Sequence, residues 1–301
     1  MKHLIIFNGT AGEGKAIEHL SNVDYSFNDL DYEIHITKEP GEATKFLKDY
    51  LSNYKDPIRV YACGGDGTLN ECVNGVYGFD NVELACYAIG TGNDFVKIYG
   101  GTNNFTDLIK LINGKAVAVD LSEITGPSLE HPVYSINVIN VGFDAIVGAY
   151  GNKYKLKGKK DPYSKAIVPA IFKGRFNKIK VTADGEVVTR KKMLLCSLAH
   201  GQYVGGKFKC APRSINTDGL IDICVVHTMS LFGFLGILGP YTEGIHFDTP
   251  KFAKKLTYKQ ATHILVESEK EMYICVDGEM HRGKTFEIKS IPSALKFVIP
   301  E

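Results

Sequence analysis

The sequence has no tryptophan, almost no excess of charge of either sign, and no long hydrophobic run. Lysine and arginine total 35 and aspartate and glutamate total 34, which leaves a formal net charge of +1. A domain that binds duplex nucleic acid usually carries a strong basic excess. We therefore expect no nucleic acid partner.

Paired cysteines are also lacking. The chain has 7 cysteines, and no two of them form a CxxC pair. This argues against a zinc cluster or a disulfide framework and favours a reducing compartment. The most apolar stretch, MSLFGFLGILGPY at 229–241, is too short and too rich in glycine to cross a bilayer, and the first residues lack the apolar segment of a signal peptide. We expect a cytoplasmic protein.

A regular alternation of elements fills the first third of the sequence. Short β-rich runs lie at 4–8, 32–37, 58–64 and 83–90, and helix-like segments lie near 13–21, 41–52, 68–77 and 104–112. Strands that alternate with helices are typical of a parallel sheet covered on both faces. This part predicts an α/β domain.

Closely spaced strands follow from about residue 116, interrupted by helical segments at 164–174 and 229–241. They predict an antiparallel sandwich or barrel. We therefore predict an α/β domain over residues 1–120 and a β domain over 121–287. The C-terminal segment, about 288–301, is a candidate to return to the first domain.

Three glycine-rich turns follow strands of the α/β part: NGTAGEGK at 8–15, CGGDGT at 63–68 and AIGTGNDF at 88–95. Ligands of parallel sheets bind at the carboxyl ends of strands, and glycine lets backbone N–H groups approach phosphate oxygens. One such turn could be ordinary turn chemistry, but three outline a phosphate-binding crevice. Neither the GxGxxG nor the GxxxxGK[ST] pattern is present, so the nucleotide would be held differently.

Further motifs extend this pattern along the chain. They are GGDGTLNECVNG (64–75), GTGNDF (90–95), INVGFDA (139–145), APRSINTDGLID (211–222) and VDGE (276–279). With them the sequence resembles the diacylglycerol kinase catalytic domain family, which includes bacterial soluble lipid kinases, sphingosine kinases and ceramide kinases. The resemblance implies an N-terminal Rossmann-like α/β domain that binds nucleotide and a C-terminal β-sandwich that binds substrate, as in NAD kinases and diacylglycerol kinases.

The resemblance also implies two cofactors, ATP and Mg²⁺, and a set of site residues. It places Asp66 and Asp94 in a water-bridged magnesium network, and it makes Glu279 the general base. A second, structural magnesium would be held by Asp218 and by the backbone oxygens of Ile215 and Leu220. The implied ATP contacts are Asn8, Gly9, Thr10, Ala11, Gly12, Thr37, Gly65, Asp66, Gly67, Thr68, Leu69, Asn70, Glu71 and Thr91.

The residues by themselves leave some of these roles open. Glu279 could be an exposed hairpin residue, because the same DGE triplet occurs at 184–186. Asp218 could serve the turn in which it lies. Only the resemblance to the family separates these alternatives.

The implied function is an ATP-dependent kinase that phosphorylates the hydroxyl of a membrane lipid, most simply diacylglycerol to phosphatidate. A kinase of the NAD kinase type and a non-catalytic nucleotide-binding regulator are the alternatives. The presence of Asp66, Asp94 and Glu279 together argues against the regulator, which has no chemical need for all three carboxylates.

A basic segment suggests where a membrane could be contacted. Residues 153–180 contain 10 lysines and arginines and 1 acidic residue, interleaved with aromatic side chains. They predict transient contact with the inner face of the membrane, although a solvated helix and loop would have the same composition. The strand near 187–199 could pair with a second copy in a homodimer.

Overall fold

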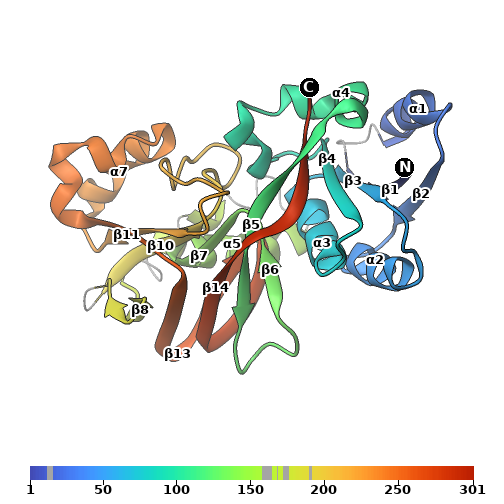
Figure 1. Ribbon diagram of the computed structural model, residues 1–301. Helices are drawn as coiled ribbons and strands as arrows, with labels where there is room; N and C mark the ends of the chain where they lie inside the picture. Colours follow the sequence, from blue (N-terminus) through green and yellow to red (C-terminus); the bar gives the residue numbers. More distant parts are fainter. Residues whose placement is uncertain (12–15, 158–164, 168, 172–175, 190–191) are drawn as a thin grey trace. The chain divides into compact units, whose positions relative to one another are not determined.

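The computed structural model describes residues 1–11, 16–157, 165–167, 169–171, 176–189 and 192–301. The chain divides into two compact units, Met1–Leu121 with Pro292–Glu301 and Ser122–Ile291. Figure 1 labels their elements. Gly12 and much of the predicted helix at 164–174 lie outside the described residues.

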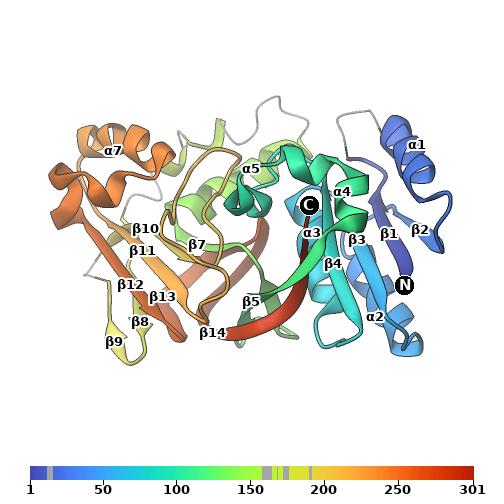
Figure 2. The same cartoon turned by 45° about the horizontal axis from the view of Figure 1, so that its top comes forward.

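The first unit contains a parallel sheet in the order β4-β3-β1-β2. Its central strands are runs of buried apolar residues, as expected for strands covered on both faces. Helices α2 and α3 pack together on one face, and α1 and α4 lie on the other (Figure 2). The bounds are β1 Lys2–Asn8, α1 Ala16–Phe27, β2 Tyr32–Thr37, α2 Glu42–Asn53, β3 Ile58–Gly64, α3 Asp66–Val76, β4 Val82–Ala88, η1 Phe95–Tyr99, η2 Asn103–Thr106 and α4 Leu108–Asn113.

The last residues of the chain belong to this first unit. The end of β14 (Glu279–Ile299) runs parallel to β4, with Phe297 opposite Leu84. The Phe297 ring lies 5.0 Å from the Phe95 ring and 5.9 Å from the Tyr99 ring, measured between centroids. The fully buried Phe297 therefore completes the core of the first unit.

The second unit is built around antiparallel strands in the order β12-β11-β10-β7-β13-β14, with β8 beside β13 and β6 beside β5. One buried cluster joins the strands β7, β8, β10, β11, β13 and β14, and another lies beneath helices α5 and α7. The bounds are β5 Lys115–Thr125, β6 Val133–Ser135, β7 Val138–Gly142, α5 Phe143–Leu156, β8 Ile179–Ala183, β9 Glu186–Val187, β10 Met193–Ala199, β11 Ile221–His227, α7 Leu231–Glu243, η3 His246–Asp248, η4 Pro250–Lys255, β12 Leu256–Ala261 and β13 His263–Val276.

Two elements of the second unit depart from the sequence predictions. Helix α5 was not anticipated; it begins directly after Gly142, whose φ of +89° ends β7. Strand β12 was also missed, because its residues LTYKQA lack a clear alternation of apolar and polar side chains. All cysteines are free, and all except Cys275 are buried. Among the described helices, none has the length and apolarity to cross a bilayer.

Candidate functional site

The glycine-rich turns after β3 and β4 touch each other at their backbones. A Cβ at Gly90 would lie only 2.2 Å from the Cα of Gly65. A Cβ at Gly64 would lie 2.2 Å from the Thr68 hydroxyl oxygen. These contacts exclude any side chain, so the glycines are required for the two turns to meet at the edge of the sheet.

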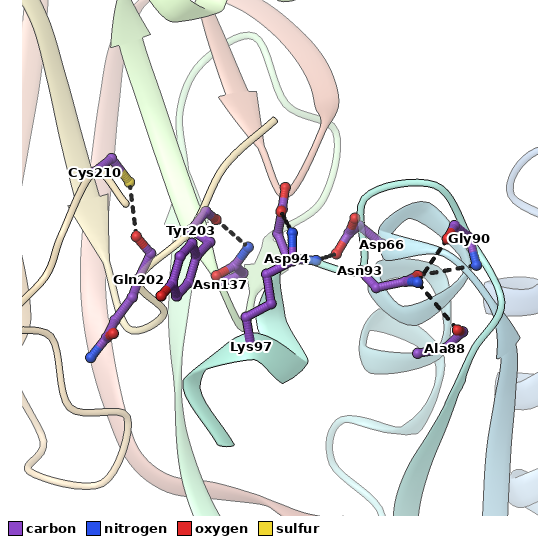
Figure 3. A network of polar contacts seen from close by, with 10 residues as sticks. All are labelled: Asp66, Ala88, Gly90, Asn93, Asp94, Lys97, Asn137, Gln202, Tyr203 and Cys210. Carbon is purple, nitrogen blue, oxygen red and sulfur yellow. Dashed lines mark hydrogen bonds and ion pairs between the residues drawn. The ribbon is translucent and has the colours of Figure 1, made fainter. Parts of the chain in front are cut away.

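Asn93 holds the turn after β4 in shape (Figure 3). Its backbone is left-handed, with φ at +49°. Its amide nitrogen donates to the carbonyl oxygens of Ala88 at 3.2 Å and Gly90 at 2.7 Å, and its amide oxygen accepts from the Gly90 N–H at 3.1 Å. Asparagine tolerates this backbone region and can satisfy several backbone groups at once.

Asn8, at the end of β1, links the first turn to the second. Its side-chain oxygen accepts from the backbone N–H of Thr10 at 3.0 Å and from the Thr10 hydroxyl at 2.8 Å. Its amide nitrogen donates to the Thr68 hydroxyl at 3.0 Å. Three loops that are far apart in the sequence thus line one edge of the sheet.

Asp66 and Asp94 face the same glycine of this edge. A Cβ at Gly92 would lie 2.6 Å from Asp66 Oδ2 and 3.6 Å from Asp94 Oδ2. Asp66 Oδ1 accepts the backbone N–H of Asp94 at 2.6 Å, as Figure 3 shows. Burial and the nearby negative charge of Asp94 raise the pKa of Asp66 to about 6. The two carboxylates therefore repel each other.

The donor set beside Gly92 fits Mg²⁺, which prefers carboxylate oxygens and keeps several of its waters. Lys97 Nζ pairs with Asp94 Oδ1 at 2.7 Å and neutralises part of the charge. Asp66 and Asp94 are the residues that would hold the ion. Among the described residues, no group of three or more histidine, cysteine, aspartate or glutamate side chains converges on one point.

Other predicted nucleotide contacts lie around the same turns. Thr91 is exposed. The side chains of Leu69 and Asn70 in α3 are buried, so a ligand could contact those two residues only through their backbone atoms. Glu71 already has a partner, because its carboxylate accepts the Ala43 N–H at the start of α2 at 3.1 Å. The remaining positions are Gly9 beside the Thr37 carbonyl, Ala11 bonded to the Asn8 carbonyl, and Gly67 in the first turn of α3.

The DGE turn of the second unit is held by the carboxylate of Asp277. Its Oδ1 accepts from the Ser135 hydroxyl at 2.6 Å and from the N–H groups of Asn137 and Val138 at 3.1 and 3.0 Å. Its Oδ2 accepts from the Ile136 N–H at 2.9 Å. These four hydrogen bonds form a cage around the carboxylate and fix the two-residue turn between β13 and β14. Glu279 follows this turn as the first residue of β14, and its side chain is exposed.

Asn137, one of the residues bonded to Asp277, also contacts the loop that follows β10. Its amide nitrogen donates to the Tyr203 carbonyl at 3.1 Å (Figure 3).

The other DGE triplet forms a similar turn with a different end. Asp184 and Asp277 both have positive φ, 46° and 47°, and each is followed by a positive-φ glycine, as in a type I′ hairpin. Glu186 is paired with Lys259 Nζ at 2.6 Å. Lys259 lies on β12, so the partner of opposite charge comes from a strand that is not paired with β9.

The residues of the predicted structural magnesium lie in the loop before β11. Asp218 Oδ1 accepts the Leu220 N–H at 3.0 Å, and Asp218 Oδ2 accepts from Gln260 at 3.3 Å. The side chain of Ile215 is exposed. Asp218 supplies one carboxylate here, so the second magnesium stays a prediction.

A cavity of about 650 Å³ lies within the second unit, between α5 and the middle of β13. Its lining combines apolar side chains such as Ile146 and Met272 with lysines such as Lys153 and with the acidic side chains of Glu269 and Glu271. The cavity is therefore lined by polar and apolar groups in similar measure.

Three residues with structural roles in the turns described above were not among the site residues predicted from the sequence: Asn93, Lys97 and Asp277. Asn93 carried a readable signal, because asparagine tolerates the left-handed backbone region and Asn93 directly follows the Gly-Thr-Gly sequence at 90–92. Asp277 lies in the DGE motif, but its partners are about 140 residues away in sequence and no local pattern points to them.

Two known protein domains match almost the whole chain. Residues 2–124 match the diacylglycerol kinase catalytic domain, and residues 137–299 match the YegS C-terminal NAD kinase beta sandwich-like domain. The chain is 30% identical over 288 residues to a diacylglycerol kinase of Bacillus subtilis, an alignment that covers 91% of this chain and 88% of the relative.

Two more relatives extend the comparison. A Shewanella frigidimarina protein named "Probable lipid kinase YegS-like" is 25% identical over 89% of this chain and 84% of its own length. A crystal structure of a diacylglycerol kinase from Bacillus anthracis has a TM-score of 0.71 and 26% identity, with 99% of this chain and 96% of that chain covered. The chain belongs to the diacylglycerol kinase family, a family of lipid kinases, and the predicted fold class is confirmed.

Proposed function

We propose that this protein transfers the γ-phosphate of ATP to the hydroxyl of a membrane lipid, with diacylglycerol as acceptor and phosphatidate as product. In this proposal the first unit binds the nucleotide and the second unit binds the lipid. The observation that carries it is the pair Asp66 and Asp94 beside Gly92, at the edge where three glycine-rich turns lie side by side.

Each group has a task in the transfer. Backbone N–H groups of the glycine-rich turns would bind phosphate oxygens, since phosphoryl transfer depends mainly on positioning and charge neutralisation. Glu279 would accept the proton of the lipid hydroxyl as its oxygen attacks the γ-phosphorus and ADP leaves. Mg²⁺, when bound, supplies positive charge beside the phosphates, and Asp66 and Asp94 would hold it there.

The test is magnesium-dependent transfer of labelled γ-phosphate from ATP into mixed micelles that contain diacylglycerol. We expect labelled phosphatidate from the native protein and a loss of at least a hundredfold in both Asp66→Ala and Glu279→Gln. Glu186→Gln is the matched control, because it alters the other DGE triplet, and it should keep full activity.

Three results would contradict the proposal. Full turnover by Glu279→Gln would show that Glu279 is not the general base. Transfer of the label to NAD instead of lipid would favour the small-molecule kinase. Binding of ATP with no product from any lipid alcohol would favour the regulator.

A further inference from the structure

Helix α7 (Leu231–Glu243) has apolar side chains on its outer surface as well as on its inner one. Its inner side buries Phe234, Ile237 and Tyr241 in the second unit. Its outer side leaves Leu231, Phe232 and Leu235 exposed by 41%, 87% and 53%. A surface helix of a soluble domain normally carries polar residues on that side. The exposed apolar side chains therefore indicate a surface that binds a partner.

A neighbouring aromatic residue enlarges this surface. Phe176, itself exposed, lines an open hollow of about 530 Å³ together with Leu231, Phe232 and Lys255. We name Phe176, Leu231, Phe232 and Leu235 the α7 patch. Phe176 also lines the 650 Å³ cavity, so the patch adjoins that cavity of the same unit.

Lysines surround the α7 patch. Lys255 lines the hollow, and Lys192 Nζ lies 5.5 Å from the centroid of the Phe176 ring. Lys251 Nζ would lie 3.9 Å from a Cβ at Gly236 of α7. The helix itself has no charged residue before Glu243. In the described part of the chain, no ion pair involves Lys251 or Lys255.

This composition favours one occupant over another. An apolar centre with a basic rim is the composition of surfaces that bind anionic bilayers, where aromatic side chains enter the acyl region and lysines contact phosphates. In a symmetric dimer the same patch would face itself, and the lysine rims would meet like charges.

We propose that the α7 patch docks the protein on an anionic phospholipid bilayer, with Phe232 inserted among the acyl chains and Lys251 and Lys255 at the phosphates. This docking proposal rests on the proposed lipid kinase function, because a lipid kinase must reach a substrate that is dissolved in a membrane. The patch shares only Phe176 with the basic segment 153–180, and it acts mainly through apolar contact.

The test is co-sedimentation of the full chain, without ATP, with vesicles of phosphatidylglycerol and phosphatidylcholine. Phe232→Ser should lower the partition coefficient at least tenfold, as expected for losing the burial of one phenylalanine. Tyr25→Ser is the matched control, since Tyr25 of α1 is exposed by 82%, and it should bind as the native chain does. Lys251→Gln with Lys255→Gln should weaken binding about thirtyfold on anionic vesicles and leave binding to pure phosphatidylcholine unchanged.

Equal binding by Phe232→Ser and the native chain would overturn the proposal. So would a native dimer in light scattering that Phe232→Ser dissociates, because the patch would then join two copies. Sedimentation needs no turnover, so vesicle binding through α7 by a protein that phosphorylates no diacylglycerol would keep the docking surface and reject the proposed function. Turnover of a short-chain diacylglycerol dispersed in water should be unchanged in Phe232→Ser.

Discussion

At the scale of single residues, Asp277 shows how one carboxylate can fix a turn. It accepts four hydrogen bonds from Ser135 and the three following backbone N–H groups, and it adopts a positive φ that asparagine also tolerates. The turn carries Glu279, so the orientation of the proposed base depends on a residue that would not itself touch the substrate.

We therefore predict that Asp277→Asn keeps the hairpin but weakens its anchor. An amide can accept with only one of its two atoms, so its nitrogen would face the Ile136 N–H or lose the other donors. We expect a loss of about 2 to 3 kcal/mol in the free energy of unfolding and a lower kcat with little change in KM. Urea unfolding and steady-state kinetics measure these effects.

The control is Asp184→Asn, which makes the same change in the other DGE turn. It should lower stability but leave kcat unchanged. If both variants lowered kcat equally, Asp277 would act only through general stability and not by positioning Glu279.

At the scale of elements, the contact between two turns decides the shape of the proposed nucleotide site. Strands β3 and β4 are parallel neighbours in register from Ile58 with Val82 to Gly64 with Ala88. The loops that leave them are therefore brought side by side, and only glycine at positions 65 and 90 lets them touch.

We predict that Gly90→Ala separates these two loops. The added methyl group would lie 2.2 Å from the Gly65 Cα and 2.9 Å from Asn93 Oδ1, so backbone must move. We expect at least a tenfold loss of affinity for ATP in titration calorimetry. Gly239→Ala is the control: it adds a methyl group in α7 of the second unit with nothing within 4 Å except its chain neighbours, and it should leave the affinity for ATP unchanged. Unchanged ATP affinity in Gly90→Ala would exclude this loop from the site.

At the scale of the whole molecule, the path of the chain ties its end to its beginning. Residues Pro292–Glu301 pack in the first unit although 170 residues of the second unit, Ser122–Ile291, precede them. Ser293, with a positive φ of 51°, donates its N–H to the buried carboxylate of Asp120 at 2.8 Å. The first unit is thus complete only when the entire chain is present.

We predict that Phe297→Ala lowers the stability of the first unit by about 3 to 5 kcal/mol, the usual cost of deleting a fully buried phenylalanine ring. Hydrogen exchange of the β3 and β4 backbone amides measures this effect in the full chain. Phe176→Ala removes an exposed ring and should change exchange little. Equal protection of β3 and β4 in Phe297→Ala and the native chain would contradict the packing described here.

The sequence by itself was sufficient for the features that depend on local pattern. The alternation of strands and helices predicted the parallel sheet, and the glycine-rich motifs led to the correct family, because turn chemistry and periodicity are written in neighbouring residues. The roles of Asp66, Asp94, Glu279 and Asp218 remain predictions. Helix α5 and strand β12 were missed where the local pattern was weak.

Only the tertiary structure decided which distant residues meet. The approach of Asp66 to Asp94, the cage around Asp277 and the packing of Phe297 join residues that are 28 to more than 200 positions apart. The exposed side of α7 also needed the structure, because its sequence is apolar on every side and does not tell which side is buried. Contacts and burial depend on how the elements pack, and no local pattern records that.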